Sequence, residues 1–283
     1  MELAYAKDVY QFGDITLDFR EETIIMGILN VTPDSFSDGG KYSRVDAAVN
    51  HAKEMLADGA KIIDVGGEST RPGHAPVLLE EELERTVPVI EAISKELNCI
   101  ISIDTYKSEV AEAAIQAGAH IINDVWGAKR DPRIAMVAAT YNVPIILMHN
   151  REVATYEDTL QVEMRKDLQE SIQIARDAGV PQSHIWLDPG IGFAKDTAEN
   201  IQAMQSLSHI ANMGYPILLG TSRKSLIGNV LHIPVEERLA GTTATVCYGI
   251  EKGCHLMRVH DVKEIAQASK MMDVLVGKRK FDK

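Results

Sequence analysis

The chain has 283 residues, of which 29 are Lys or Arg and 41 are Asp or Glu, so its formal net charge is −12. Hydrophobic residues make up 45% and charged residues 25%, ordinary proportions for a globular protein that exclude disordered and collagen-like chains. The acidic balance argues against nucleic acid or an anionic membrane as a partner, because either would require a basic face. An anionic substrate would therefore need positive charge that is concentrated at one site.

The three cysteines, Cys99, Cys247 and Cys254, are odd in number and form no C-x-x-C pair. This pattern suits a reducing compartment and predicts neither a disulfide framework nor a zinc site. The N-terminal residues contain Glu2 and Asp8 and no long apolar run, so no signal peptide is expected, and no apolar stretch is long enough to span a bilayer. These features predict a soluble, cytoplasmic protein.

The first expected element is a β-hairpin over Val9–Phe19, with Gly13-Asp14 at its turn. After it, one unit repeats: a short β-branched apolar run, a polar or Gly-rich loop, and a helix. The runs are apolar without alternation, which is typical of parallel strands covered on both faces. Eight such runs follow each other: Ile24–Asn30, Lys61–Val65, Ile100–Asp104, His120–Asp124, Val143–His149, His184–Asp188, Pro216–Gly220 and His255–His260.

The segments between the runs show helical spacing of apolar residues. In the first of them, one helical face is formed by Val45, Ala48, Val49, Ala52 and Leu56. Several of these segments end in a glycine just before the next strand, where a helix C′ residue adopts a left-handed conformation; these are Gly59, Gly118, Gly179 and Gly253.

Eight strand–helix units without a linker or low-complexity segment predict an α/β fold of the (β/α)8 TIM-barrel type. A doubly wound sheet is the alternative, for which eight units would be many. We expect a single domain over residues 1–283, in which residues 1–22 form a hairpin that covers the N-terminal end of the barrel. Barrel enzymes place their chemistry at the carboxyl ends of the strands, so a site is expected there.

Polar residues stand at those expected strand ends. They are Asn30, Asp64, Asp104, Asn123, His149, Asp188, Lys224, Arg258 and His260. An aspartate in such a place can instead cap the next helix, and Asp104, Thr105 and Asp261 have this alternative. Capping explains Asp64 less well, because glycines follow it rather than a helix. Asp188 precedes a proline, which keeps the backbone extended and favours a functional interpretation.

The segment Gly220–Ser225 contains Arg223 and Lys224 where we expect the first turn of a helix. The helix macrodipole disfavours cations there by a few tenths to about 1 kcal/mol, and a bound anion would reverse that effect. A solvated basic turn is the alternative for Lys224 alone. The nearby Arg258 and His260 favour an anion site.

Other motifs are weak. Gly190-Ile191-Gly192 resembles the start of a dinucleotide fingerprint, but Lys195 stands where the third glycine would be. The sequence has no P-loop, no His/Cys cluster with zinc spacing and no G-x-S-x-G segment.

The strand-end motifs closely resemble those of the dihydropteroate synthase family, over almost the whole chain after the hairpin. Met26–Gly40 is similar to the first family signature and Asp64–Gly73 to the second. Shorter matches are Ser102–Thr105, Ile122–Asp124, Asp188–Phe193, Ser222–Ser225 and Arg258–Val262. Asn150–Thr159 matches no pattern of the family.

The resemblance implies a folate-pathway transferase. Such an enzyme joins 6-hydroxymethyl-7,8-dihydropterin diphosphate to p-aminobenzoate, releases pyrophosphate, uses Mg2+ and is the target of sulfonamides. It also implies a homodimer formed through the late helices, for which the faces around Ala240–Tyr248 and Ala266–Met272 would be suitable. The partners are then small-molecule substrates and a second copy of the chain.

The resemblance also assigns roles to individual residues. Asp188 and Asn123 would bind the guanine-like edge of the pterin, whose adjacent donors suit a carboxylate, and Asp104 would contact the far ring. Lys224 and Arg258 would lie near the pterin, with the guanidinium stacked on its face. By this match, the further substrate-binding residues are His260, Thr70, Arg71, Phe193, Ser225, Met148 and Gly220. Asn30 would bind the metal ion. The residues expected to act in catalysis are Lys224, Arg258, Asp104 and Asp38.

Charge suggests how such a reaction would proceed. The departing diphosphate and the electron-rich dihydropterin favour loss of pyrophosphate before the weak aniline attacks. Loops Asp34–Tyr42 and Glu68–Pro76 would close over the intermediate. Two alternatives are a methyltetrahydrofolate methyltransferase domain on the same barrel, and a non-catalytic paralogue that binds pterin or acts as a scaffold.

Overall fold

The computed structural model describes residues 8–32, 41–68 and 77–280, without the side chains of residues 41–43. Each run predicted as a strand overlaps one parallel strand. These strands are β3 (Ile24–Asn30), β4 (Ile62–Gly66), β5 (Ile100–Asp104), β6 (Ile121–Asp124), β7 (Ile145–Met148), β8 (Ile185–Asp188), β9 (Leu218–Leu219) and β10 (Leu256–Val259). They pair in the order β8-β7-β6-β5-β4-β3-β10-β9, and a parallel bridge between Leu187 and Ile217 joins the two ends of this sheet. The sheet is therefore closed, and the TIM-barrel prediction is confirmed.

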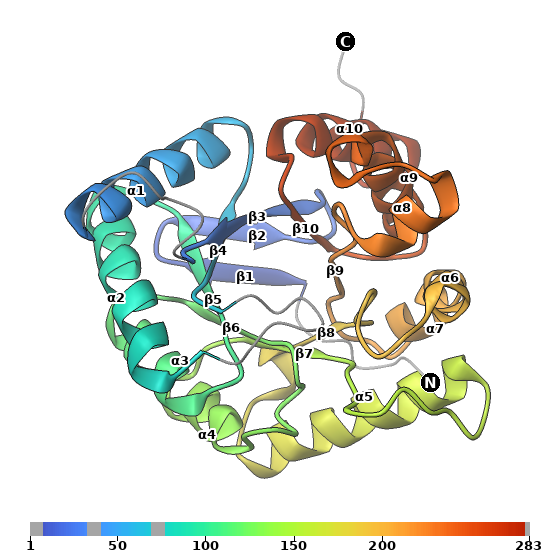
Figure 1. The fold of residues 1–283 in the computed structure, drawn as a ribbon, viewed down its shortest axis with the longest axis horizontal. Coiled ribbons are helices and arrows are strands. Elements are labelled where there is room, and N and C mark those ends of the chain that lie inside the picture. The colour runs from blue at the N-terminus through green and yellow to red at the C-terminus, as the bar shows by residue number, and fades with distance from the viewer. Residues whose placement is uncertain (1–7, 33–40, 69–76, 281–283) are drawn as a thin grey trace.

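Helices surround the strands on the outside (Figure 1). They are α1 (Lys41–Ala57), α2 (Leu79–Glu96), α3 (Ser108–Gln116), α4 (Arg133–Tyr141), α5 (Leu160–Asp177), α6 (Thr197–Gln205), α7 (Leu207–Ala211), α8 (Ser225–Leu231), α9 (Leu239–Glu251) and α10 (Val262–Leu275), with short 3-10 turns at Gln182–His184 and Val235–Glu237. The predicted face of α1 is buried at Ala48, Val49 and Ala52. Every glycine predicted at a helix end has a positive φ, for example +112° at Gly59, a conformation that L side chains rarely adopt.

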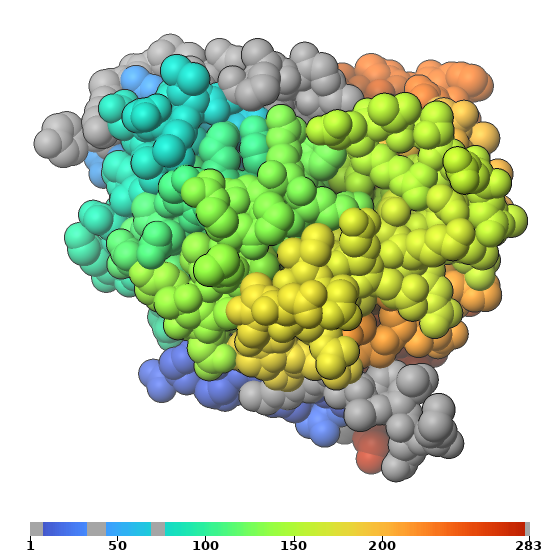
Figure 2. All heavy atoms as spheres, turned by 90° about the horizontal axis from the view of Figure 1, so that it is seen from below, coloured from blue at the N-terminus to red at the C-terminus, as the bar shows by residue number. Residues whose placement is uncertain are grey.

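The N-terminal hairpin consists of β1 (Val9–Phe12) and β2 (Ile15–Asp18), as predicted. Its Tyr10 ring lies 5.0 Å from the Trp186 ring of β8, and Phe19 lies 5.5 Å from the same ring. These residues belong to a buried cluster with the first inward-facing residues of the barrel strands, such as Ile62 and Ile100. Figure 2, a view from the side, shows the blue hairpin at one end of the molecule. The hairpin thus fills the N-terminal end of the barrel, which leaves the carboxyl end for a site.

A second, larger apolar cluster fills the space between the strands and the helices. Its members include Ile63 and Ile101, whose neighbours Ile62 and Ile100 face the barrel interior, so successive strand residues point to opposite sides. Both sides are buried, which explains why the strands read as continuous apolar runs. In the described part of the chain, no helix combines the length and the hydrophobicity that crossing a bilayer requires.

Candidate active site

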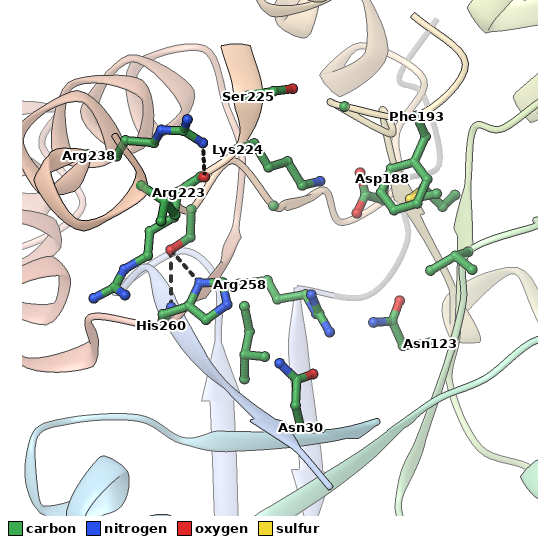
Figure 3. A pocket seen from close by; sticks show the side chains of 17 residues that line it. Asn30, Asn123, Asp188, Phe193, Arg223, Lys224, Ser225, Arg238, Arg258 and His260 are labelled. Atoms are coloured by element: carbon green, nitrogen blue, oxygen red, sulfur yellow. Dashed lines mark hydrogen bonds between the residues drawn. The ribbon is translucent and has the colours of Figure 1, made fainter. Parts of the chain in front are cut away.

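A cavity of about 380 Å³ lies at the carboxyl ends of the strands (Figure 3). Most of the residues predicted for the site line it: Asn30, Asn123, Met148, Asp188, Phe193, Gly220, Lys224, Ser225, Arg258 and His260. Asp104 lies just beneath it, in contact with Arg258. Asp38, Thr70 and Arg71 fall outside the described residues, as do most of the two predicted closing loops.

At the bottom of the cavity, one guanidinium is shared by two buried carboxylates. Nε of Arg258, from β10, donates to Oδ2 of Asp64 at 2.6 Å, and its Nη2 donates to Oδ2 of Asp104 at 2.6 Å. Asn123 donates to the same Asp64 oxygen at 3.2 Å. Burial raises the pKa of Asp104 to about 7; the guanidinium opposes this shift, and the neighbouring Asp64 carboxylate adds to it. The sequence drew attention to Asp64 but gave it no role, whereas the structure places it at the centre of this group.

This arrangement predicts a specific pH dependence of stability. The pKa of Asp104 is higher in the folded than in the unfolded chain. Its favourable contribution to the free energy of unfolding is therefore present at low pH and is lost as the pH rises through about 7. The stability of Asp104→Asn should therefore improve relative to the parent protein between about pH 5 and about pH 8. Urea unfolding at both pH values measures this, with Asp46→Asn on the exposed face of α1 as the control. A stability difference that does not vary with pH would contradict the shift.

Asp188 ends β8, and Figure 3 shows its carboxylate inside the cavity opposite Lys224. Its Oδ1 accepts a hydrogen bond from the backbone N–H of Gly190 at 2.7 Å, and the residue is only 5% exposed. Burial raises the pKa of Asp188, while Lys224, the Gly190 amide and Arg258 oppose that shift. The turn after Asp188 holds the carboxylate at the strand end, as the following proline predicted.

Lys224 lies across the cavity from Asp188. Its Nζ donates to the carbonyl oxygen of Ile191 and lies 4.7 Å from the centre of the Phe193 ring. Burial lowers the pKa of this amine to about 8, and the Asp188 carboxylate opposes the decrease. The ammonium and the aromatic ring therefore form one wall, with Ser225 directly after Lys224.

The prediction that Arg223 and Lys224 lie in the first turn of a helix was wrong. α8 begins only at Ser225, because Arg223 has a φ of +57° that a helix does not permit. The Arg223 backbone N–H donates to Oγ1 of Thr242 at 3.1 Å, and its Nε donates to Asp261 at 2.9 Å. The two cations thus lie before the helix rather than in it.

The capping alternatives fail for the two aspartates. Asp261 precedes α10, but its side chain caps no helix amide and binds the Arg223 guanidinium instead. Asp104 binds Arg258, and α3 begins at Ser108 without a side-chain cap from its N-cap residue. Thr105 does accept a hydrogen bond from the Lys107 N–H, at 3.2 Å, just before α3.

The remaining side of the cavity is basic. His260 follows β10, and its backbone N–H donates to Oγ of Ser222 at 3.1 Å while its Nδ1 lies 3.0 Å from the same oxygen (Figure 3). Arg238 lines the cavity as well, and its Nη1 donates to the Arg223 carbonyl at 2.9 Å. Arg238 was not among the residues predicted from the sequence, because it stands at no strand end and in no motif.

The donor set limits how Mg2+ could bind. In the part of the chain that the structure describes, no group of three or more His, Cys, Asp or Glu is arranged to hold a metal ion. Mg2+ usually keeps several waters and takes its other ligands from one or two side-chain oxygens and from substrate phosphates. The amide of Asn30, which ends β3 in the cavity beside Arg258 and His260, offers one such oxygen. The described residues fit a Mg2+ ion that arrives with a diphosphate.

Comparison with known proteins agrees with this geometry. The family model described as "Pterin binding enzyme" matches residues 26–260. A dihydropteroate synthase of Bacillus subtilis is 59% identical over 93% of this chain and 92% of its own length. The crystal structure of a dihydropteroate synthase from Clostridium difficile, in the presence of pteroic acid, has a TM-score of 0.89 and 48% identity, and the match covers 92% of this chain and 98% of that one.

A dihydropteroate synthase of Xanthomonas albilineans, solved with 4-aminobenzoic acid, also has a TM-score of 0.89, with 39% identity over 95% of this chain and 98% of its own. These matches span the barrel and all strand ends that line the cavity. The chain belongs to the dihydropteroate synthase family of pterin-binding enzymes.

Proposed function

We propose that this protein joins 6-hydroxymethyl-7,8-dihydropterin diphosphate to p-aminobenzoate and forms 7,8-dihydropteroate and pyrophosphate. One observation carries the proposal: a buried carboxylate–amide pair, Asp188 and Asn123, shares one cavity with the cations Lys224 and Arg258 and with His260. A flat heterocycle with adjacent N–H donors on one edge would match the carboxylate and the amide. Its anionic tail would match the cations. The relatives that resemble this chain carry the same activity in their names.

The acidic half of the cavity would select the pterin. The Asp188 carboxylate is a pure acceptor when it is ionised, so it pairs with the ring N–H and the amino group side by side. Asn123 offers a further polar contact to the same edge. Asp104 would contact the far ring. The planar Arg258 guanidinium, whose orientation is fixed by two carboxylates, would stack on the face of the heterocycle.

The basic half would receive the diphosphate. His260 and Arg258 would bind the leaving group together with Asn30, which would also hold Mg2+. When bound, that ion supplies additional positive charge to the departing oxygens. Lys224 and Arg258 stabilise the same charge from the protein side, in a cavity where electrostatic interactions are stronger than in water.

The order of bond changes follows from these charges. The bond from the methylene carbon to the diphosphate oxygen breaks first, and its electron pair leaves with pyrophosphate. The dihydropterin donates electron density to the carbon that remains. The nitrogen of p-aminobenzoate then forms the new C–N bond and releases a proton. Phe193 and Ser225 would bind this second substrate, as would Thr70 and Arg71 of the second loop.

Positional isotope exchange tests this order. Pterin diphosphate labelled with 18O at the oxygen between the methylene carbon and the first phosphorus should scramble its label in the enzyme without p-aminobenzoate. Cleavage of the C–O bond makes this oxygen a terminal oxygen of pyrophosphate, which can rotate before it recombines. Scrambling that occurs only when the amine is present would favour direct displacement.

A pyrophosphate-release assay tests the activity itself. Release that depends on both substrates and yields dihydropteroate is the expected result. A methyltransferase on the same barrel would release no pyrophosphate, and a pterin-binding scaffold would bind the pterin without turnover. Either outcome would overturn the proposal.

The proposal includes a cytoplasmic homodimer formed through the late helices. Exposed apolar side chains on α8 and α10 support such an interface; they include Val230, Leu231, Met271 and Leu275. Light scattering after size-exclusion chromatography would distinguish a dimer from a monomer.

A further inference from the structure

Next to the cavity lies a partly buried cluster of charged residues that the proposed reaction does not use. Its centre is Lys195, at the end of the loop between β8 and α6. Its Nζ lies 2.8 Å from Nδ1 of His149 and donates to the carbonyl oxygens of Gly190 at 3.0 Å and Phe193 at 3.1 Å. His149 has no exposed surface. Two of the three contacts of this ammonium are therefore with the backbone of its own loop.

The cluster continues into the loop after β7, the segment for which the sequence offered no role. Nε2 of His149 lies 2.9 Å from Asp167 of α5, and Asp167 accepts a hydrogen bond from Nε of Arg151 at 2.6 Å. The Tyr156 ring stacks on His149 with 6.3 Å between ring centres, and its hydroxyl donates to the carbonyl of Ala194 at 2.6 Å. The loop after β7 is thus bonded to the loop after β8.

The loop that is held in this way has an unusual backbone. Gly190, Gly192 and Ala194 all have positive φ, at +67°, +85° and +47°. Such a path costs free energy for a residue like Ala194, so surrounding contacts must maintain it. Lys195 and Tyr156 supply these contacts, because together they bind the carbonyls of residues 190, 193 and 194.

The same loop shapes one wall of the active site. Its Ile191 carbonyl accepts the hydrogen bond of Lys224, and its Phe193 ring lies against the same ammonium. We propose that Lys195, supported by His149 and Tyr156, is a positioning residue that sets the p-aminobenzoate wall through this loop. This inference rests on the proposed function only for the identity of the second substrate. The contacts of Lys195, His149 and Tyr156 with the loop do not depend on it.

The charges around Lys195 agree with this role. Burial lowers the pKa of its amine to about 7, while Asp188, Asp167 and Glu199 oppose the decrease and Lys224 adds to it. Burial also lowers the pKa of His149 to about 4, so the imidazole is neutral near pH 7 and one ring nitrogen can accept from the lysine. Burial of a lysine is costly unless its amine is hydrogen-bonded, and Lys195 meets this condition through His149 and two carbonyls of the loop.

The test compares Lys195→Met, which keeps most of the side-chain volume, with Lys166→Met on the exposed side of α5 as the matched control. We expect the KM for p-aminobenzoate to rise about tenfold in Lys195→Met and the KM for the pterin diphosphate to change less than about threefold, since a misplacement of about 1 Å can cost on the order of 100-fold. Lys166→Met should leave both values unchanged.

A second variant keeps the test decisive if Lys195→Met does not fold. Tyr156→Phe removes only the hydroxyl that binds Ala194, on a partly exposed residue, and should raise the same KM about threefold. Equal increases in both KM values, or no increase in either variant, would overturn the inference.

Hydrogen–deuterium exchange separates this inference from the proposed function, because it requires no turnover. The Gly192 amide donates to Oδ1 of Asn200 in α6, and the Phe193 amide donates to the Gly190 carbonyl within the loop. Exchange in residues 190–193 should accelerate in both variants and stay unchanged in the control. Unaltered exchange contradicts the positioning role, whereas an inactive parent protein would contradict only the proposed function.

Discussion

Asp188→Asn is expected to lower kcat/KM by about 100- to 1000-fold, which corresponds to the loss of about 3 to 4 kcal/mol of interaction with the bound pterin. The carboxylate is a pure acceptor for two adjacent donors, whereas an asparagine presents an NH2 group to one of them. The substitution also leaves the Lys224 ammonium without its opposing charge across the cavity. The volume of the side chain is almost unchanged, so the loss would be electrostatic.

Titration calorimetry with a pterin ligand and steady-state kinetics would measure this effect. Asp177→Asn, on the exposed end of α5, is the matched control, because it removes the same charge from a residue that does not line the cavity. Pterin affinity within about threefold of the parent protein would remove Asp188 from the pterin site, since a charge-assisted hydrogen bond in a buried position contributes more than that.

Arg258→Met should affect both activity and stability. It leaves the carboxylates of Asp64 and Asp104 buried without their shared cation, and breaking a buried ion pair in this way costs about 3 to 5 kcal/mol. Turnover should fall at least about 100-fold, because the variant also loses a cation that faces the leaving group. The loss of stability should be larger at about pH 8 than at about pH 5, where protonation of Asp104, whose pKa is raised to about 7, relieves the repulsion.

Arg133→Met is a stringent control for this variant. Arg133 also binds two carboxylates, those of Asp131 and Glu109, but its side chain is 65% exposed. Exposed pairs contribute about 0 to 1 kcal/mol, so this variant should unfold almost like the parent protein. Urea unfolding of both variants gives the comparison. Similar losses in the two would show that burial does not determine the importance of Arg258.

Much of the fold could be predicted from the sequence because its signals are local. The continuous apolar runs follow from burial on both faces of each strand, and the glycines at helix ends follow from left-handed backbone at Gly59 and its equivalents. In a closed parallel barrel the carboxyl ends of all strands lie at the same end, so the residues that follow the strands are expected to lie close together. Asp188 and Asn123 do so.

Predictions that depended on the partner of a side chain were less successful. Asp261 and Asp104 had the local pattern of helix caps, yet each binds an arginine that is distant in the sequence. Binding an arginine instead of capping a helix is favourable, because a buried or half-buried carboxylate is stabilised more by a guanidinium than by one helix amide. The start of α8 was also misplaced, since nothing in the residue type of Arg223 indicates its positive φ.

By itself, the sequence determined the barrel, its hairpin plug and the kinds of side chain at its mouth, because periodicity, turn residues and strand ends are properties of short segments. Only the tertiary structure decided that Arg258 lies between Asp64 and Asp104, 194 and 154 residues away, and that Lys195 joins two loops behind the wall of the site. Such pairings depend on which groups lose their water together when the barrel closes, and no single segment contains that information.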